Sequence, residues 1–218
     1  MTKKKTIAAI ILGLGIGVAF SFGNLRAMQS FQNVINNYRP LFQQAPSSRV
    51  TATTLYEAWD IARGYAQAWS QDATLTSLIS SDVNDPDANA LSGSDGRRRT
   101  WLVEVTSQKQ GKQLFFQINN GEVIHAAEDG IYDPATPTFS EKPAIDSEEV
   151  LKQAKSTMAE FASSIGRGRG YHFALQAVNG YPVLTVIGSS KSAEGEQKVT
   201  ALDLDVKAGQ IIAARIVP

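Results

Sequence analysis

The sequence predicts an α+β protein in which two tandem copies of one small module, a helix packed on an antiparallel sheet, follow an N-terminal transmembrane helix. Three observations predict this fold: a charge-free N-terminal run, two capped amphipathic helices, and a strand hairpin that occurs twice with matching residues. A chain of 218 residues has room for two small domains, and 43% hydrophobic residues are enough for packed cores.

The N-terminal run covers residues 6–22 and follows three lysines, Lys3–Lys5. Its length is at the short limit for a bilayer-spanning helix, and the lysines favour a cytoplasmic N-terminus. A cleaved signal peptide, which would give a secreted form, is the alternative, but small residues are poorly placed for cleavage. We therefore predict a signal anchor over residues 1–23 that contacts the lipid bilayer through residues 6–22, with the C-terminal body outside the cytoplasm.

The next segment, residues 24–50, is expected to be an amphipathic stalk followed by a linker. Its apolar residues recur at spacings of three or four, which indicates a helix up to Pro40. They are Leu25, Met28, Phe31, Ile35, Tyr38 and Phe42. The stripe either rests on lipid headgroups or contacts a partner's transmembrane helix, and for the second case Met28, Phe31 and Ile35 are the candidate partner-binding residues.

Charge and cysteine content exclude several classes of function. Every charged residue before Glu57 is basic, whereas the formal net charge of the whole chain is zero, so the rest of the chain is acidic. An acidic body argues against nucleic-acid binding, which requires a concentrated basic surface. The chain has no cysteine, which excludes disulfides, thiolate metal sites and cysteine nucleophiles.

Two helices are predicted from their caps and apolar stripes. The first begins at Thr54, which forms a capping box with Glu57, and its stripe continues to Trp69. The second begins at Asp146 and is expected to end at Gly166. Because each helix has one apolar face, each is expected to pack on the sheet that follows it.

Strands are predicted after each helix from alternating apolar and polar residues. The predicted strands are residues 101–105, 112–119 and 122–127 in the first copy, and 171–178, 183–187, 199–206 and 210–217 in the second. Gly121 and Gly209 are the predicted structural turn residues of the last hairpin in each copy. An insertion over residues 80–99 stands where the first copy should have its first strand, so this strand is expected to be short or absent.

The last hairpins of the two copies align without a gap at a constant offset of 88 residues. The aligned stretches are FQINNGEVI (residues 116–124) and LDVKAGQII (residues 204–212). A capped helix followed by strands that end in this hairpin resembles the PepSY family. The resemblance implies a cystatin-like fold, no catalytic residues, and a role in binding or inhibiting other proteins outside the cytoplasm.

The domain boundaries follow from this duplication. PepSY-like module 1 is expected over residues 51–131 and PepSY-like module 2 over residues 146–218. A proline-rich linker over residues 132–145 is expected to connect them, because proline breaks both helix and strand.

The search for reactive groups indicates neither an enzyme nor a cofactor. The two histidines, His125 and His172, fall in different copies and outside any triad or metal-ligand spacing. The acidic loop over residues 82–89 resembles a calcium loop only in part, because Ala90 and Gly96 stand where that pattern needs glycine and glutamate. We interpret this loop as solvated.

The basic run Arg97, Arg98 and Arg99 is the remaining candidate contact. We interpret it as a solvated sheet edge that discourages aggregation, and binding of an acidic partner is the alternative.

The function predicted from these observations is that of a membrane-anchored, extracytoplasmic protein-binding module without catalytic activity, which regulates an envelope protease or cell-wall enzyme. The expected mechanism is capture of an extended segment or a partner loop by the sheet edges or by the concave face of the module. The alternative is a non-catalytic scaffold subunit of a multi-subunit membrane complex.

Overall fold

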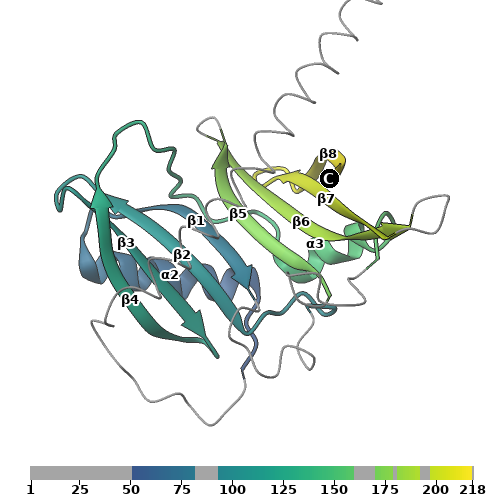
Figure 1. The fold of residues 1–218 in the computed structure, drawn as a ribbon, viewed down its shortest axis with the longest axis horizontal. Coiled ribbons are helices and arrows are strands. Elements are labelled where there is room, and N and C mark those ends of the chain that lie inside the picture. Colours follow the sequence, from purple (N-terminus) through teal and green to yellow (C-terminus); the bar gives the residue numbers. More distant parts are fainter. Residues whose placement is uncertain (1–50, 82–92, 160–169, 179–180, 192–196, 218) are drawn as a thin grey trace, which may run out of the picture.

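The computed structural model describes residues 51–81, 93–159, 170–178, 181–191 and 197–217 (Figure 1). Two helices are present in these ranges, α2 (Leu55–Trp69) and α3 (Ser147–Ala154). The strands are β1 (Thr74–Ser81), β2 (Thr100–Ser107), β3 (Lys112–Asn119), β4 (Glu122–Ile131), β5 (His172–Val178), β6 (Tyr181–Lys191), β7 (Gln197–Asp205) and β8 (Gln210–Val217). The order of one helix and four strands therefore occurs twice along the chain.

All eight strands belong to one antiparallel sheet, in the order β4-β3-β2-β1-β5-β6-β7-β8. The two sets of four strands join where β1 pairs with β5, and Leu78 lies opposite Leu175 in that pair. The predicted fold class of two separate helix-on-sheet modules is therefore wrong. The strands form a single eight-stranded sheet with only two helices in the described ranges.

The physical reason for this difference is the strand that was expected to be short or absent. That strand is β1, a full strand of eight residues, Thr74–Ser81, which includes the first two positions of the predicted insertion. As the first strand of each set of four, β1 and β5 would each leave one row of backbone groups without a partner. Pairing them satisfies both rows at once and removes two open edges.

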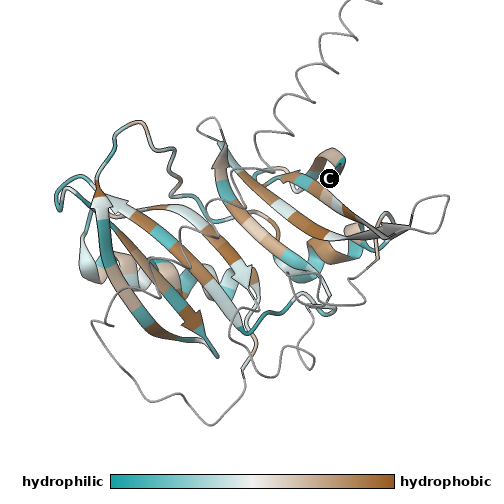
Figure 2. Cartoon of the chain, in the orientation of Figure 1, coloured by the Kyte–Doolittle hydropathy of each residue, from teal (hydrophilic) through white to brown (hydrophobic). Residues whose placement is uncertain are grey.

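One hydrophobic core runs across both halves. A row of buried apolar residues crosses the sheet from β3 to β7, one residue per strand. The row is Phe116, Val103, Leu78, Leu175, Leu184 and Leu204. Both helices lie behind the sheet in the view of Figure 1, and α2 contacts β1 to β4 whereas α3 contacts β6. Figure 2 shows hydrophobic residues on strands of both halves.

The helix starts agree with their predicted caps. Thr54 and Glu57 form a complete capping box at the start of α2, and Asp146 is the N-cap of α3. The Ser147 hydroxyl also accepts a hydrogen bond of 2.9 Å from the amide of Leu55 in α2. The two helices therefore begin at the same place and share capping groups.

The predicted end of the second helix at Gly166 is wrong, because α3 ends at Ala154. Just beyond its last turn, the Ser156 hydroxyl donates to the carbonyl of Gln153 at 2.7 Å. A side chain that bonds locally to the backbone competes with helical hydrogen bonds. Residues 160–169, with Phe161 of the predicted stripe, lie outside the described residues.

The segment predicted to be a linker, residues 132–145, packs against both halves. Phe139 is buried, stacks on Trp59 of α2 and donates its amide to the carbonyl of Leu75 at 2.8 Å. At the other end of the segment, Ile145 is buried and the amide of Ala144 donates to the carbonyl of Val206. This segment is therefore part of the core that both halves share.

No helix in the described ranges is long and apolar enough to cross a bilayer. The single-pass topology predicted from the sequence, with a cytoplasmic N-terminus and an extracytoplasmic body, is therefore not supported, and the membrane prediction is corrected accordingly. The segment predicted to contact lipid, residues 6–22, and the predicted stalk in residues 24–50 lie outside the described residues.

Candidate protein-interaction edge

The eight-stranded sheet has two edge strands, β4 and β8, and they belong to the two hairpins that align in the sequence. Each hairpin pairs a well-buried strand, β3 or β7, with the edge strand. Each edge strand also has a register shift near its turn, at Ile124 in β4 and at Ile212 in β8. The two edges therefore have closely similar backbone plans and can be compared residue by residue.

Glycine in the left-handed region closes both hairpins, as the sequence predicts. Asn120 and Gly121 both have positive φ, which is the conformation that a two-residue hairpin turn of this twist requires. Gly209 has a φ of 64° and closes a longer turn. A Cβ at Gly209 would lie 3.3 Å from Cδ1 of Ile145, so the β7–β8 turn is packed against the segment that connects the halves.

The β8 edge is exposed and apolar. Every residue from Gln210 to Ala214 is exposed, including Ile211 and Ile212, which have exposed fractions of 42% and 59%. Among the described strands, β8 pairs only with β7. No described strand pairs with the outer row of backbone groups of β8, and apolar side chains lie beside this row.

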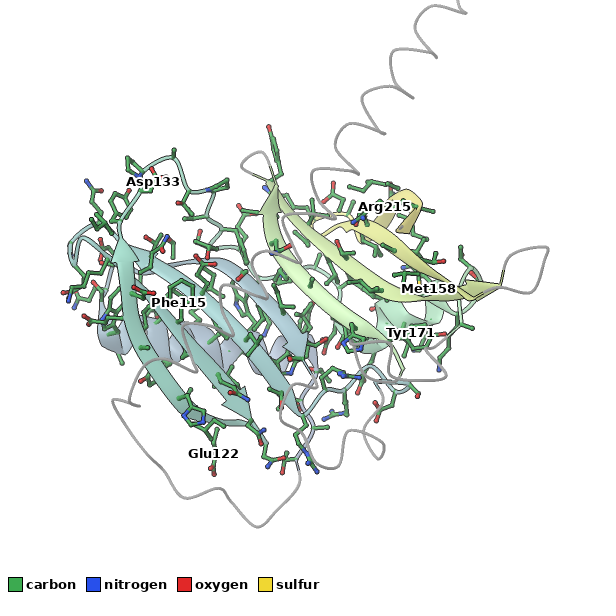
Figure 3. All side chains as sticks on the ribbon, in the orientation of Figure 1. Phe115, Glu122, Asp133, Met158, Tyr171 and Arg215 are labelled. Carbon is green, nitrogen blue, oxygen red and sulfur yellow. The ribbon has the colours of Figure 1, made fainter. Side chains whose placement is uncertain are left out.

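The β4 edge carries charge where β8 does not. Glu122, His125, Glu128 and Asp129 of β4 correspond, at the offset of 88, to glutamine, alanine, isoleucine and valine in β8. Charged residues on an edge strand discourage pairing with another chain. Figure 3 shows Glu122 at the β3–β4 turn and Arg215 on β8, toward the opposite end of the sheet. The sheet therefore has one edge strand that carries charged side chains, β4 (the guarded edge), and one that presents apolar side chains, β8 (the unguarded edge).

The charged side chain described in β8, Arg215, is held by its own chain. Its guanidinium contacts the carboxylate of Asp203 in two hydrogen bonds, of 2.9 and 3.1 Å. Asp203 also accepts a hydrogen bond of 2.7 Å from the buried hydroxyl of Thr185. This neutralised cluster lies on β6, β7 and β8, so it fixes β8 to the sheet and leaves the edge without net charge.

The short second helix explains why β8 is exposed on the helix side of the sheet. Helix α2 has fifteen residues and reaches β4, where Ala126 is only 4% exposed. Helix α3 has eight residues and contacts β6, and the corresponding residue of β8, Ala214, is exposed. Within the described residues, the outer strand of the second half is therefore more exposed on the helix side than the outer strand of the first half.

Two of the three predicted arginines, Arg97 and Arg98, contact the second half of the chain. Arg97 pairs with Glu57 of α2 at 3.1 Å and with Glu148 of α3 at 3.0 Å. Arg98 is fully buried and donates to the carbonyl of Tyr171 at 3.2 Å, and burial lowers its pKa to about 10. Arg99 is also buried. The solvated-edge interpretation is wrong for Arg98 and Arg99, and binding of a partner by the three stays a prediction.

The other candidate residues do not gather at one place. Met28, Phe31 and Ile35 lie outside the described residues. His125 is on β4 and His172 is buried on β5, on different strands of the sheet. Within the described ranges, no three histidine, aspartate or glutamate side chains lie together as metal ligands would.

Sequence reasoning missed the β8 edge, although a signal for it was present. The pattern of residues 210–217 predicts the second strand of a hairpin. A local sequence pattern does not indicate whether a strand has one neighbour or two in the sheet. The useful signal was the loss of charge relative to the aligned hairpin, because residues 122, 128 and 129 are acidic and their counterparts are neutral.

No protein-family model, curated protein or solved structure matches this chain. The resemblance to the PepSY family therefore receives no support from comparison with known proteins. The two sheet edges differ in charge and in exposure, and this difference is the structural feature that points to a function.

Proposed function

We propose that the protein is a non-enzymatic protein-binding module that captures an extended segment by adding it as a strand to β8. The observation that carries this proposal is the row of exposed residues from Gln210 to Ala214 on β8, which has one neighbour, β7, among the described strands. In strand addition, main-chain hydrogen bonds give affinity, and alternate side chains of the added strand give specificity. An edge that presents apolar side chains and no net charge suits an apolar segment.

The guarded β4 edge supports the same proposal by contrast. Both edges end the same sheet, but Glu128 of β4 accepts a hydrogen bond from the indole of Trp69 in α2 and pairs with Lys112. The β4 edge is thus acidic and tied to its helix. If an exposed edge had no use, charged residues on β8 would protect it as they protect β4.

The test is binding of an array of random octapeptides to the 218-residue chain and to two matched variants. Ala213→Lys adds a positive charge to the β8 edge, at a position that pairs with Asp203 of β7. The control, His125→Lys, adds a positive charge at the corresponding position of the β4 edge. We expect the wild-type chain and His125→Lys to bind apolar peptides and Ala213→Lys to lose them. Binding that is equal in all three proteins would contradict the proposal.

A further inference from the structure

We propose that the strand added to β8 is β8 of a second copy of this chain, so that two copies pair antiparallel and their sheets become continuous. This inference rests on the proposed function, because it names the partner of the same edge. It has three independent supports in the described residues.

The first support is the way in which the chain joins its own halves. The first strands of the two sets, β1 and β5, pair antiparallel at the centre, and Leu78 lies directly opposite Leu175. Both helices remain on one side of the sheet (Figure 1). An antiparallel β8–β8 pair between two copies would repeat this arrangement at the outer edge, with the helices of both copies on the same side.

The second support is charge. In a symmetric pair, each residue meets the same strand of the other copy, so a charged edge repels itself. The β4 edge carries Glu122, Glu128 and Asp129, and a symmetric β4 pair centred near His125 would bring Glu122 of one copy close to Glu128 and Asp129 of the other, so acidic groups would meet although Lys112 pairs with Glu128. The β8 edge has no net charge to repel its copy, because Asp203 neutralises Arg215 within each copy. The chain also has zero formal net charge, so the copies do not repel each other as whole molecules.

The third support is the apolar surface beside β8 on the helix side. Ile211 pairs with the buried Leu204 and Ala214 pairs with the buried Leu202, yet both β8 residues are exposed. Two β8 strands side by side would place two such surfaces next to each other. Each copy would then shield apolar area of the other, which favours association.

The principal experiment is sedimentation velocity of the 218-residue chain over a series of concentrations. We expect a monomer–dimer equilibrium for the wild type and for His125→Lys. Ala213→Lys should raise the dissociation constant at least about tenfold, because two lysines are brought together across the symmetric pair. A wild-type chain that remains monomeric at every concentration, or an Ala213→Lys dimer as stable as the wild type, would overturn the inference.

Charge exchange separates a lost contact from a lost fold. Ala213→Glu alone should also be monomeric, whereas an equimolar mixture of Ala213→Lys and Ala213→Glu should recover the dimer as a mixed species. Circular dichroism should show folded chains in every case. Two folded variants that stay monomeric when mixed would contradict direct pairing of the two β8 strands.

Cross-linking locates the contact, because the chain has no cysteine of its own. Single variants Ala213→Cys and Ala214→Cys lie where a symmetric antiparallel pair brings a residue close to its own copy, within the Cα separation of about 4.4–6.8 Å that a disulfide spans. At least one of them should form a disulfide-linked dimer under mild oxidation, and His125→Cys should not. Equal cross-linking of His125→Cys would overturn the assignment to β8.

The array peptides distinguish this inference from the proposed function. A wild-type chain that binds apolar octapeptides but never dimerises would overturn the second-copy partner and leave the proposed function standing. If the wild-type chain forms a dimer and added peptides dissociate that dimer, the result supports both the proposed function and the second-copy partner. A chain that neither dimerises nor binds peptides contradicts both.

Discussion

Ser147 shows how one small side chain links the two halves of the molecule. Its hydroxyl accepts the amide of Leu55 at 2.9 Å and donates to the carbonyl of Gly96 at 2.7 Å, and the residue is fully buried. Asp146 beside it accepts the amide of Tyr56 at 3.0 Å. These two residues cap a helix that begins about ninety positions earlier in the sequence.

Replacing this hydroxyl should therefore destabilise both halves. In Ser147→Ala the amide of Leu55 and the carbonyl of Gly96 stay buried without this partner, which costs about 1–3 kcal/mol of unfolding free energy. Urea denaturation measures the loss. Ser156→Ala removes an exposed hydroxyl beyond the end of α3 and is the control, for which little change is expected. A Ser147→Ala chain as stable as the wild type would contradict the shared cap.

Glu104 makes stability depend on pH. It lies on β2 opposite Ser77 and Phe115, and burial raises the pKa of its carboxyl, although hydrogen bonds from Thr76 and Ser77 oppose the rise. The folded protein thus favours the neutral acid more than the unfolded chain does. This contribution to stability is present below the pKa of the unfolded chain and is lost as pH rises through the raised pKa.

Glu104→Gln should remove that pH dependence. The amide keeps a similar shape without the charge, so the variant should have a higher urea midpoint than the wild type at neutral pH and a similar one in acid. Glu122→Gln, at an exposed turn position, is the control, and its midpoint should follow the wild type at both pH values. A Glu104→Gln variant less stable than the wild type at neutral pH would contradict the argument.

At the scale of the elements, the two hairpin turns differ in what surrounds them. A Cβ at Gly121 would meet only the Thr53 methyl, at 3.7 Å, whereas a Cβ at Gly209 would press on Ile145 at 3.3 Å. Both glycines have positive φ, so alanine is strained by about 1–2 kcal/mol at either position. Only the Gly209 turn adds a steric contact to this strain.

Gly209→Ala should accordingly destabilise the protein more than Gly121→Ala does. Urea denaturation of the two variants measures the difference. Combining Gly209→Ala with Ile145→Val should recover part of the excess, because the shorter side chain lacks the Cδ1 methyl. Equal losses for both glycines would show that the connecting segment does not support the β7–β8 turn.

Local elements were largely predictable from the sequence, and contacts between distant elements were not. The Thr54–Glu57 capping box and the Asn120-Gly121 turn are signals within a few residues, and the structure confirms them. The pairing of β1 with β5 has no local signal, because both are ordinary strands that read equally well as edges of separate sheets. The open side of β8 was missed for the same reason, since exposure depends on how far α3 extends.

At the scale of the whole molecule, a single sheet and a single core imply that the halves unfold together. All three tryptophans, Trp59, Trp69 and Trp101, lie in the first half, so their fluorescence reports mainly on that half, and Trp101 also stacks on Phe173 of β5. Leu184 lies in β6 of the second half and is fully buried. Leu184→Ala should lower stability by about 2–5 kcal/mol and shift the tryptophan transition with it. An unchanged tryptophan transition would show that the halves unfold independently.

Amide hydrogen exchange of the 218-residue chain, measured at low and high protein concentration, shows both whether the two halves share one sheet and whether β8 pairs with a second copy. If one sheet ends in an open β8 edge, the amides of Leu78 and Leu175 exchange slowest at low concentration, and those amides from Ile211 to Ala214 that point away from β7 exchange fast. Raising the concentration should then slow exchange in β8 and leave β4 unchanged. Fast exchange at Leu78 and Leu175, or protection of β8 that does not change with concentration, would contradict the account.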